Sequence, residues 1–296
     1  MVVPESEVAW WDLTAAALGP QRAFRVVVVG EDKVLKSGAA FLKASAPRAA
    51  AREFNGMGYR LQMLIKIGVA AHVPTDFYVT FDCDVALAKP LKPGMLVKED
   101  EGGARGEGGR GRMRGIMQGE MRGPHASRWM SHSTDMFFGV DVGSARGREG
   151  RCTVEYLLRT MGVTPAVMSK RAALAVISKL QDIAAAAKRG SFIATQSWDA
   201  YLMSALETGA DWTEYGLYAA GTCLAGLLEE VHVHDPNVRL YDPELQEDGS
   251  AYTDQQRMAR AFDPEGKDLF VVLQSIGGSN AVEAAAAMYA HVKPVQ

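Results

Sequence analysis

Three consecutive segments of the chain constrain its fold most strongly. RVVVVG at residues 25–30 is a run of β-branched residues and predicts a buried strand, and DFYVTF at 76–81 predicts a second one. Between them, apolar residues recur every three to four positions from Leu61 and Leu64 onward, which predicts a helix over 58–71. Strand, helix and strand in this order are typical of a βαβ unit. We therefore expect an α/β fold in which helices flank a mostly parallel sheet.

Two carboxylates, Asp82 and Asp84, stand where the second of these strands ends. Acids this close in sequence repel each other unless a cation or a proton relieves the repulsion. The carboxyl ends of parallel strands form the crevice in which α/β proteins bind ligands, and paired carboxylates suit Mg²⁺ or Mn²⁺. The other interpretation is a solvated turn with no ligand.

The composition is that of an ordinary folded protein. Of 296 residues, 48% are hydrophobic and 23% are charged, and the formal net charge is -3. A domain that binds nucleic acid usually has a basic excess, so nucleic acid is not an expected partner of the chain as a whole.

Cysteines and apolar runs bound the cellular context only loosely. The chain has three cysteines, Cys83, Cys152 and Cys223, with no zinc-type spacing, and a bridge between Cys152 and Cys223 is possible. No run of about 18 apolar residues occurs, so we expect no transmembrane segment, and the N-terminus does not have the pattern of a signal peptide. A membrane anchor upstream of this sequence stays open.

The remaining segments show no linker, so we expect one domain over residues 1–296. Further helices are expected at 162–190, 197–209, 212–226 and 280–292. Further strands are expected at 135–143, 229–235 and 269–275. The helix at 162–190 is expected to begin with Thr164 as its N-cap and Pro165 in its first turn, and the helix at 197–209 with Ser197 as its N-cap. Residues 102–123 are rich in glycine and arginine and predict a flexible insertion.

The helix over 58–71 also carries a polar stripe. Tyr59, Gln62 and Lys66 lie at i, i+3 and i+7, beside the apolar face. A lysine on a helix next to the Asp82 strand can supply a point charge to a diphosphate. An ordinary surface lysine accounts for the spacing equally well.

From these residues the sequence resembles a known group of enzymes. The stretch GYRLQMLIKIGVAAHVPTDFYVTFDCDVALAKPL at 58–91 is similar to metal-dependent nucleotide-sugar glycosyltransferases of the GT-A fold. It looks most like a family of glycosyltransferase-like proteins with a G-[WY]-R-x-Q-x-x-x-K helix before a D-x-D strand, and it is distantly similar to glycogenin-like enzymes. Shorter segments at 162–174, 196–202, 212–218 and 270–275 fit the same pattern, so the resemblance runs from about Arg25 to Ser275.

The resemblance implies roles for particular residues. It implies a GT-A (Rossmann-like) domain in which Mn²⁺ or Mg²⁺ is held by Asp82, Asp84 and His234. The donor would be contacted by Lys66, Gln62, Arg60 and Asp82. Glu214 would be the catalytic base that deprotonates the acceptor in an inverting transfer, with Asp199 as the weaker alternative. Glu214 is equally explained as a first-turn acid beside a capping Thr213, stabilised by the helix dipole.

The expected partners are a nucleotide-sugar donor, most simply a UDP-sugar, and a carbohydrate acceptor. Such enzymes work in the Golgi lumen of eukaryotes or in the cytoplasm of bacteria. Two other functions stay open. One is a haloacid-dehalogenase-like, Mg²⁺-dependent phosphohydrolase, although the chain lacks the later Gly-Asp-x-x-x-Asp that such enzymes use. The other is a non-catalytic module that binds a sugar nucleotide or a glycan.

Overall fold

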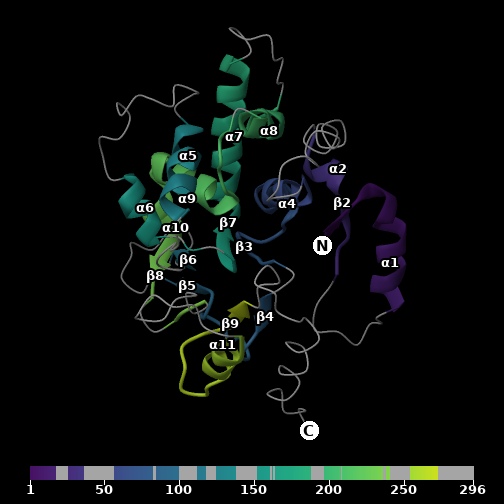
Figure 1. Ribbon diagram of the computed structural model, residues 1–296. Helices are drawn as coiled ribbons and strands as arrows, with labels where there is room; N and C mark the ends of the chain where they lie inside the picture. Colours follow the sequence, from purple (N-terminus) through teal and green to yellow (C-terminus); the bar gives the residue numbers. More distant parts are fainter. Residues whose placement is uncertain are drawn as a thin grey trace. The chain divides into compact units, whose positions relative to one another are not determined.

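Figure 1 shows the structure of the protein, a computed structural model that describes part of the chain. The described residues are 1–17, 26–36, 57–82, 85–99, 112–117, 125–137, 152–160, 162, 164–187, 197–207, 209–235, 238–240 and 254–272. The predicted helix at 280–292 lies outside them.

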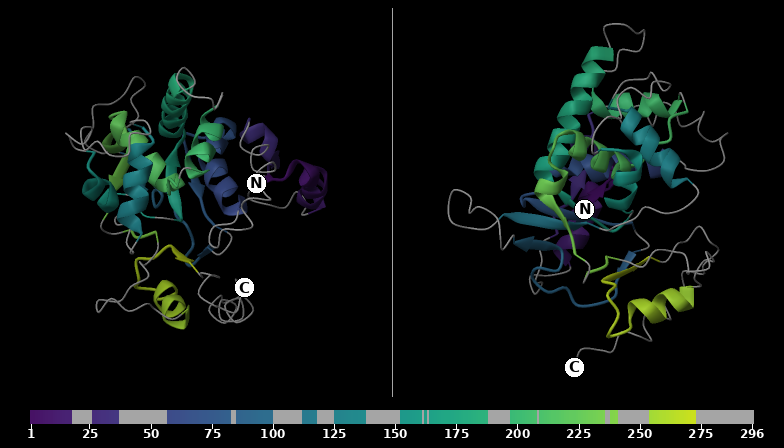
Figure 2. Two further views of the ribbon diagram at one scale, coloured as in Figure 1. Left: turned by 45° about the horizontal axis from the view of Figure 1, so that its top comes forward. Right: turned by 90° about the vertical axis from the view of Figure 1, so that its left-hand side faces the viewer.

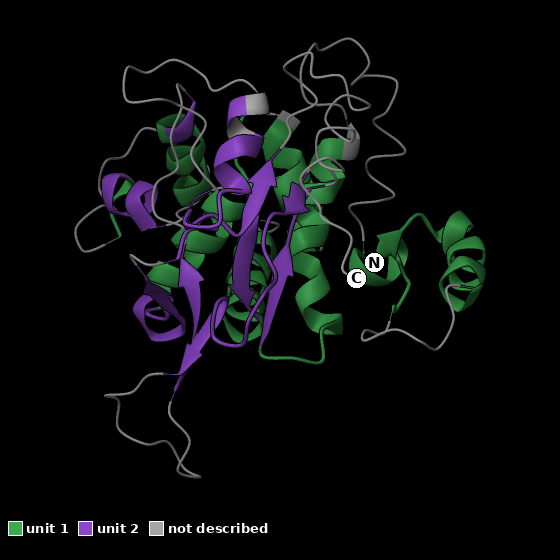
Figure 3. Ribbon diagram, turned by 90° about the horizontal axis from the view of Figure 1, so that it is seen from below, with its two compact units in different colours: residues 1–76, 127–154, 170–225 green, residues 77–126, 155–169, 226–296 purple. Residues whose placement is uncertain are grey.

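The chain divides into two compact units, each built from three separate stretches (Figure 3). Unit 1 comprises residues 1–76, 127–154 and 170–225, and unit 2 comprises 77–126, 155–169 and 226–296. Each unit is described by itself below. The single domain over residues 1–296 stays a prediction.

Unit 1 is mainly helical. Its elements are β1 (Val2–Val3), the 3-10 helix η1 (Glu5–Glu7), α1 (Val8–Ala17), β2 (Val29–Gly30), α2 (Glu31–Val34), α4 (Met57–Gly68), the 3-10 helix η2 (Val69–His72), α5 (Ala126–Asp135, in this unit from Ser127), α7 (Lys170–Ala187), α8 (Trp198–Glu207) and α9 (Glu214–Leu224). The predicted helix over 58–71 is confirmed as α4 with η2, and those over 197–209 and 212–226 are confirmed as α8 and α9.

The long helix α7 organises the core of unit 1 and packs against α4, α8 and α9 (Figure 1). Its fully buried residues recur every three to four positions, at Ala172, Ala173, Val176, Leu180 and Ala184. Helix α9 is buried over nine of its eleven residues, from Glu214 to Thr222. A Cβ added at Gly221 would stand 2.7 Å from the side chain of Val176 in α7, so a glycine there permits the close approach of the two helices.

Unit 2 contains most of the strands. Its elements are β3 (Phe77–Thr80), β4 (Val85–Leu87), β5 (Val97–Glu99), β6 (Met113–Met117), α6 (Val154–Thr160, in this unit from Glu155), β7 (Ala166–Ser169), α10 (Leu228–Val231), β8 (His232–His234), α11 (Asp254–Ala261) and β9 (Phe270–Val272). Helix α11 packs on β9, and both are found at the yellow end of the colour scale in Figure 2. Val167, Leu240, Leu269 and Phe270 form a buried hydrophobic cluster, against which side chains of β3 and β4 pack.

The strands pair in both directions. β1 with β2 and β6 with β8 are parallel, whereas β3 with β7, β4 with β9 and β5 with β6 are antiparallel. The expected mixture of helices and strands is therefore present, but the described ladders are short and mixed. Within them β3 pairs with β7, so a mostly parallel GT-A sheet is not confirmed.

The structure corrects four of the predicted elements. Residues 166–169 are strand β7, and the helix begins only at Lys170, because AVMS pairs with β3 and the Oγ of Thr164 accepts a hydrogen bond from the backbone N–H of Asp82. Inside the predicted flexible insertion at 102–123, residues 113–117 form β6 between β5 and β8. The predicted strand at 229–235 begins as helix α10. Asp135 ends helix α5 instead of starting the predicted strand at 135–143, and residues 138–143 lie outside the described residues.

A disulfide joins Cys152 to Cys223 with Cα atoms 5.8 Å apart, so the bridge that the sequence allowed is confirmed. Among the described residues, no helix combines the length and apolar character needed to cross a membrane.

Candidate functional site

A buried ion pair between α4 and α9 forms the centre of the candidate site. The Nζ of Lys66 lies 2.8 Å from the Oε1 of Glu214, although the two residues are 148 positions apart in the sequence. Their side chains are only 7% and 4% exposed. Two residues that the sequence singled out separately are therefore brought into direct contact within unit 1.

Local sequence explains how each partner is placed. Lys66 projects from the same side of α4 as the buried residues Met63 and Ile67, and not from an exposed polar stripe. Lys66 is therefore not the ordinary surface lysine that the spacing also allowed, because the counter-charge that permits its burial comes from a different helix. Glu214 is the first residue of α9, and Thr213 caps that helix by accepting a hydrogen bond from the N–H of Gly216 at 3.0 Å.

Tyr215 is a third member of the site, and no sequence pattern singled it out. The ammonium of Lys66 donates to its hydroxyl at 3.0 Å and lies 4.9 Å from the centre of its ring. Tyr215 is itself buried. Its position next to Glu214 in WTEYGLY was the available signal, but a tyrosine there also reads as an ordinary core residue.

A buried ion pair needs a specific explanation because removing two charges from water is expensive. The desolvation of both groups offsets much of their attraction, and a hydrophobic pair of similar volume is often at least as stable. Lysine and glutamate side chains are accordingly among those that are rarely buried in a folded protein. The pair of Lys66 and Glu214 is thus a stronger candidate for function than either residue was from sequence alone.

The segment that leads into α9 is held by a second charged cluster around Asp211. Arg60 from α4 donates to its Oδ1 at 2.9 Å, Arg128 from α5 forms an ion pair with its Oδ2, and Trp129 donates to Oδ2 at 3.0 Å. Burial alone raises the pKa of Asp211, but the hydrogen bonds from Arg60 and Arg128 and the charge of Arg60 bring it below its usual range.

The other predicted residues of unit 1 have different surroundings. Arg60, expected to contact a donor, also donates to the carbonyl of Trp212 at 3.0 Å, so it holds protein groups in this structure. Gln62 is partly buried on α4. Asp199 is fully buried in the first turn of α8, where Ser197 is the N-cap as expected and accepts from the N–H of Ala200.

The predicted metal ligands belong to unit 2. Asp82 lies two residues beyond the end of β3 and is partly buried, and its N–H is fixed by Thr164 at 2.9 Å. Asp84 lies outside the described residues. His234 is exposed at the end of β8, and its neighbour Asp235 is buried and forms an ion pair with Lys98.

The carboxylate of Asp82 offers oxygen atoms, which are the ligands that a hard divalent cation prefers. Within the described ranges, no cluster of three or more histidine, cysteine, aspartate or glutamate side chains is arranged to hold a metal. The fit of Mn²⁺ or Mg²⁺ rests on the carboxylate of Asp82 and on its place just past a strand end.

His232, two residues before His234 in β8, is buried. Burial lowers the pKa of His232 from 6.5 to about 4, partly opposed by the hydrogen bond that its Nδ1 donates to the carbonyl of Gly115 at 3.3 Å. The two histidines of β8 therefore have opposite surroundings.

Comparison with known proteins identifies a family but no characterised relative. Residues 1–107 and 154–292 match a family of unknown function, DUF6492, and the chain belongs to that family. No curated protein and no solved structure matches the chain. Lys66, Glu214, Tyr215, Arg60 and Asp211 all lie in the matched stretches, whereas α5 lies between them.

Proposed function

We propose that this member of the DUF6492 family is a metal-dependent glycosyltransferase. It would move a sugar from a nucleotide-sugar, most simply a UDP-sugar, to a hydroxyl group of a glycan or a similar acceptor. The observation that carries the proposal is the buried contact between Lys66 and Glu214. The resemblance marks one of these residues for the donor and the other for the acceptor, and a transfer needs both in one place.

In this proposal Lys66 changes partner when the donor binds. A diphosphate carries more negative charge than a single carboxylate, and the ammonium group of lysine commonly binds phosphates as a point charge. When the ammonium of Lys66 turns to the donor phosphates, the carboxylate of Glu214 loses its counter-charge and can accept the proton of the acceptor hydroxyl. This exchange reconciles a buried Glu214 with a role as base, which requires contact with the reacting proton.

The roles of the remaining residues follow from their chemistry. Tyr215 keeps one hydrogen bond to Lys66, which limits how far the ammonium moves. Asp82 and Asp84, with His234 as a further candidate ligand, would hold Mn²⁺ or Mg²⁺. When bound, such an ion neutralises charge that develops on the leaving diphosphate. Arg60 and Gln62 stand on the same helix as Lys66 and would contact the donor beside it.

The disulfide supports one of the two expected locations. Disulfides persist in oxidising compartments and are rare where thiols are kept reduced. The bridge between Cys152 and Cys223 therefore favours the Golgi lumen, or another oxidising compartment, over the cytoplasm.

A thermal-shift screen of nucleotide sugars with and without Mn²⁺, followed by an assay of donor consumption, tests the proposal. We expect one nucleotide sugar to raise the melting temperature only with Mn²⁺, and the Asp82→Ala variant to lose that shift. Glu214→Gln is expected to keep the shift and to lose transfer to an acceptor. Metal-dependent release of phosphate from a phosphomonoester, with no response to any nucleotide, would show that the protein is a phosphohydrolase and that the proposal is wrong.

A further inference from the structure

Two backbone N–H groups just before α9 are held by side chains of α5. The N–H of Asp211 donates to the Nδ1 of His132 at 2.8 Å, and the N–H of Thr213 donates to the Oγ of Ser133 at 3.2 Å. His132 and Ser133 are adjacent in α5. The chain is thus fixed at two points within the three residues that precede Glu214.

The same face of α5 also holds the side chain of Asp211. Arg128 and Trp129 both reach its Oδ2 from one turn earlier in the helix. Arg128, Trp129, His132 and Ser133 stand at i, i+1, i+4 and i+5, so they form one continuous helix face. This face of α5 acts on residues 211–213 and is called the brace below.

The brace does more than cap a helix. The cap of α9 is already made by the Oγ of Thr213, which accepts from the N–H of Gly216. The N–H groups held by His132 and Ser133 lie at Asp211 and Thr213, ahead of the first helical residue. Holding them fixes the direction in which the chain enters α9, and so the position from which Glu214 projects.

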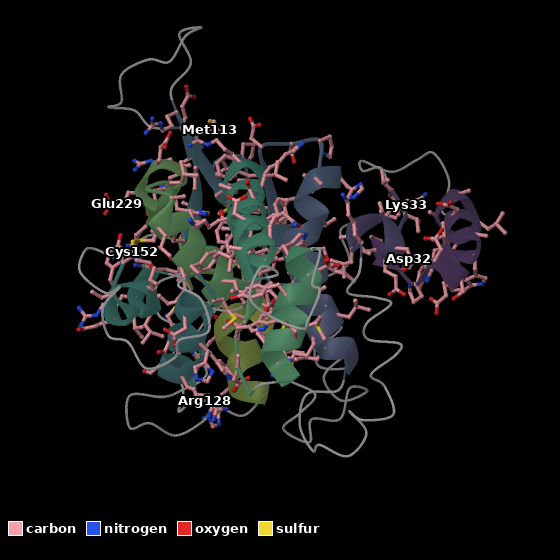
Figure 4. All side chains as sticks on the ribbon, turned by 90° about the horizontal axis from the view of Figure 1, so that it is seen from above. Asp32, Lys33, Met113, Arg128, Cys152 and Glu229 are labelled. Atoms are coloured by element: carbon pink, nitrogen blue, oxygen red, sulfur yellow. A yellow bond between two sulfur atoms is a disulfide. The ribbon has the colours of Figure 1, made fainter. Side chains whose placement is uncertain are left out.

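The other end of α9 is tied to the same part of the chain. Cys223, in the last turn of α9, is bonded to Cys152, and Figure 4 labels Cys152 and Arg128 of the brace. The brace and Cys152 both lie in residues 108–153, between the two stretches that match the family. Helix α9 is thus held at its beginning and near its end by a segment outside those stretches.

An ion pair of 2.8 Å in a buried setting tolerates little displacement. An increase of a few tenths of an ångström in this distance weakens both the charge interaction and the hydrogen bond. Side chains at functional sites therefore need support from the residues packed behind them. Lys66 lies in the last turn of α4, and the backbone continues from there directly into the 3-10 helix η2, whereas Glu214 is the first residue of α9, where the chain enters from a loop. The member of the pair that requires external support is Glu214.

We infer that α5 positions Glu214 against Lys66, with Ser133 and His132 as positioning residues. A role of this positioning in catalysis rests on the glycosyltransferase function proposed above, but the positioning itself can be measured without any ligand. The quantity that reports it is the coupling between Lys66 and Glu214. A double-mutant cycle of Lys66→Met and Glu214→Gln gives this coupling from unfolding equilibrium constants.

Neighbouring residues of α5 offer a matched pair of variants. Ser133→Ala and Thr134→Val each remove one hydroxyl from a buried residue of the same helix. Only Ser133 contacts the segment before Glu214, because the hydroxyl of Thr134 donates to the carbonyl of Met130 within α5. Both variants are expected to lower stability, so stability alone does not separate them.

The cycle is measured in the wild-type, Ser133→Ala and Thr134→Val backgrounds by urea unfolding. We expect Ser133→Ala to reduce the coupling, expressed as a ratio of equilibrium constants, by about fivefold, and Thr134→Val to leave it unchanged. An unchanged coupling in Ser133→Ala would overturn the inference and leave Ser133 with a purely structural role. A reduction of the same size in Thr134→Val would overturn it as well.

A second variant keeps the test decisive if Ser133→Ala does not fold. Arg128→Gln removes an ion pair from Asp211 at a side chain that is 57% exposed, so folding should survive. In the Arg128→Gln background the coupling between Lys66 and Glu214 should fall, though by less than in Ser133→Ala. A coupling equal to that in the wild-type background would contradict the inferred role of the brace.

The result is independent of the proposed function. If Ser133→Ala reduces the coupling while the wild-type protein shows no Mn²⁺-dependent shift with UDP or UDP-glucose, the brace stands and the glycosyltransferase proposal loses its support. If the wild-type protein shows that shift but the coupling is unaffected by Ser133→Ala, the proposed function stands and the brace is wrong.

Discussion

Replacing Lys66 with methionine should destabilise the protein strongly, because it leaves a buried carboxylate without its counter-charge. At 2.8 Å and an effective dielectric constant of about 20, two unit charges attract each other by about 6 kcal/mol. Desolvation of both groups offsets much of that attraction, but a single substitution keeps the desolvation of Glu214 and loses the attraction. We expect Lys66→Met to lower the free energy of unfolding by about 3–5 kcal/mol.

The double variant isolates the interaction between Lys66 and Glu214 from the separate effects of the two substitutions. Glu214→Gln alone should cost about as much as Lys66→Met, since it leaves the buried ammonium of Lys66 without its counter-charge. Lys66→Met combined with Glu214→Gln removes both charges, and its loss should be smaller than the sum of the single losses by about 3 kcal/mol. Urea unfolding followed by far-ultraviolet circular dichroism measures all four proteins.

An exposed ion pair of the same protein supplies the control. Arg159 and Glu155 lie 2.7 Å apart on α6, with side chains 70% and 77% exposed. The corresponding cycle of Arg159→Met and Glu155→Gln should give a coupling of about 0.5 kcal/mol or less. If the effects of Lys66→Met and Glu214→Gln also add to within about 0.5 kcal/mol, the two residues do not form a buried pair and the site described here is wrong.

Two further predictions concern the disulfide and the buried histidine. Cys152→Ser with Cys223→Ser opens a loop with a sequence separation of 71, for which the chain-entropy relation gives a loss of about 4 kcal/mol; equal unfolding free energies with and without the bridge would contradict its role. His232 has a pKa of about 4 in the folded protein against 6.5 in the unfolded chain. Its contribution to the free energy of unfolding is therefore complete above pH 6.5 and is lost as the pH falls toward 4. The loss should approach about 3 kcal/mol, and His232→Gln should make unfolding less sensitive to pH over this range; an identical pH dependence in wild type and variant would refute it.

The sequence predicted features that depend on local pattern. The periodicity of α4 and the caps Ser197 and Thr213 of α8 and α9 rest on neighbouring residues, and the structure agrees. The sequence predicts a helix where β7 lies, because Thr164 and Pro165 resemble the start of a helix locally. Its strand conformation comes from pairing with β3, a partner that is distant in sequence.

The contacts of the candidate site depended on distant partners. Helical spacing placed Lys66 on a polar stripe, because no local pattern announces a counter-charge 148 residues later. Tyr215 and Asp211 were missed for the same reason. Each acquires its significance from Lys66 or from arginines on other helices. Residue types at a site can therefore be predicted from a motif, whereas their partners require the fold.

The most direct test of the central claim compares the affinity of two variants for UDP in the presence of Mn²⁺ by isothermal titration calorimetry. If Lys66 exchanges Glu214 for the donor phosphates, Glu214→Gln removes the competing anion and should lower Kd by about tenfold. Lys66→Met removes the charge that binds the phosphates and should raise Kd by about tenfold or more. Equal affinities in wild type, Glu214→Gln and Lys66→Met would show that the buried pair takes no part in binding a nucleotide.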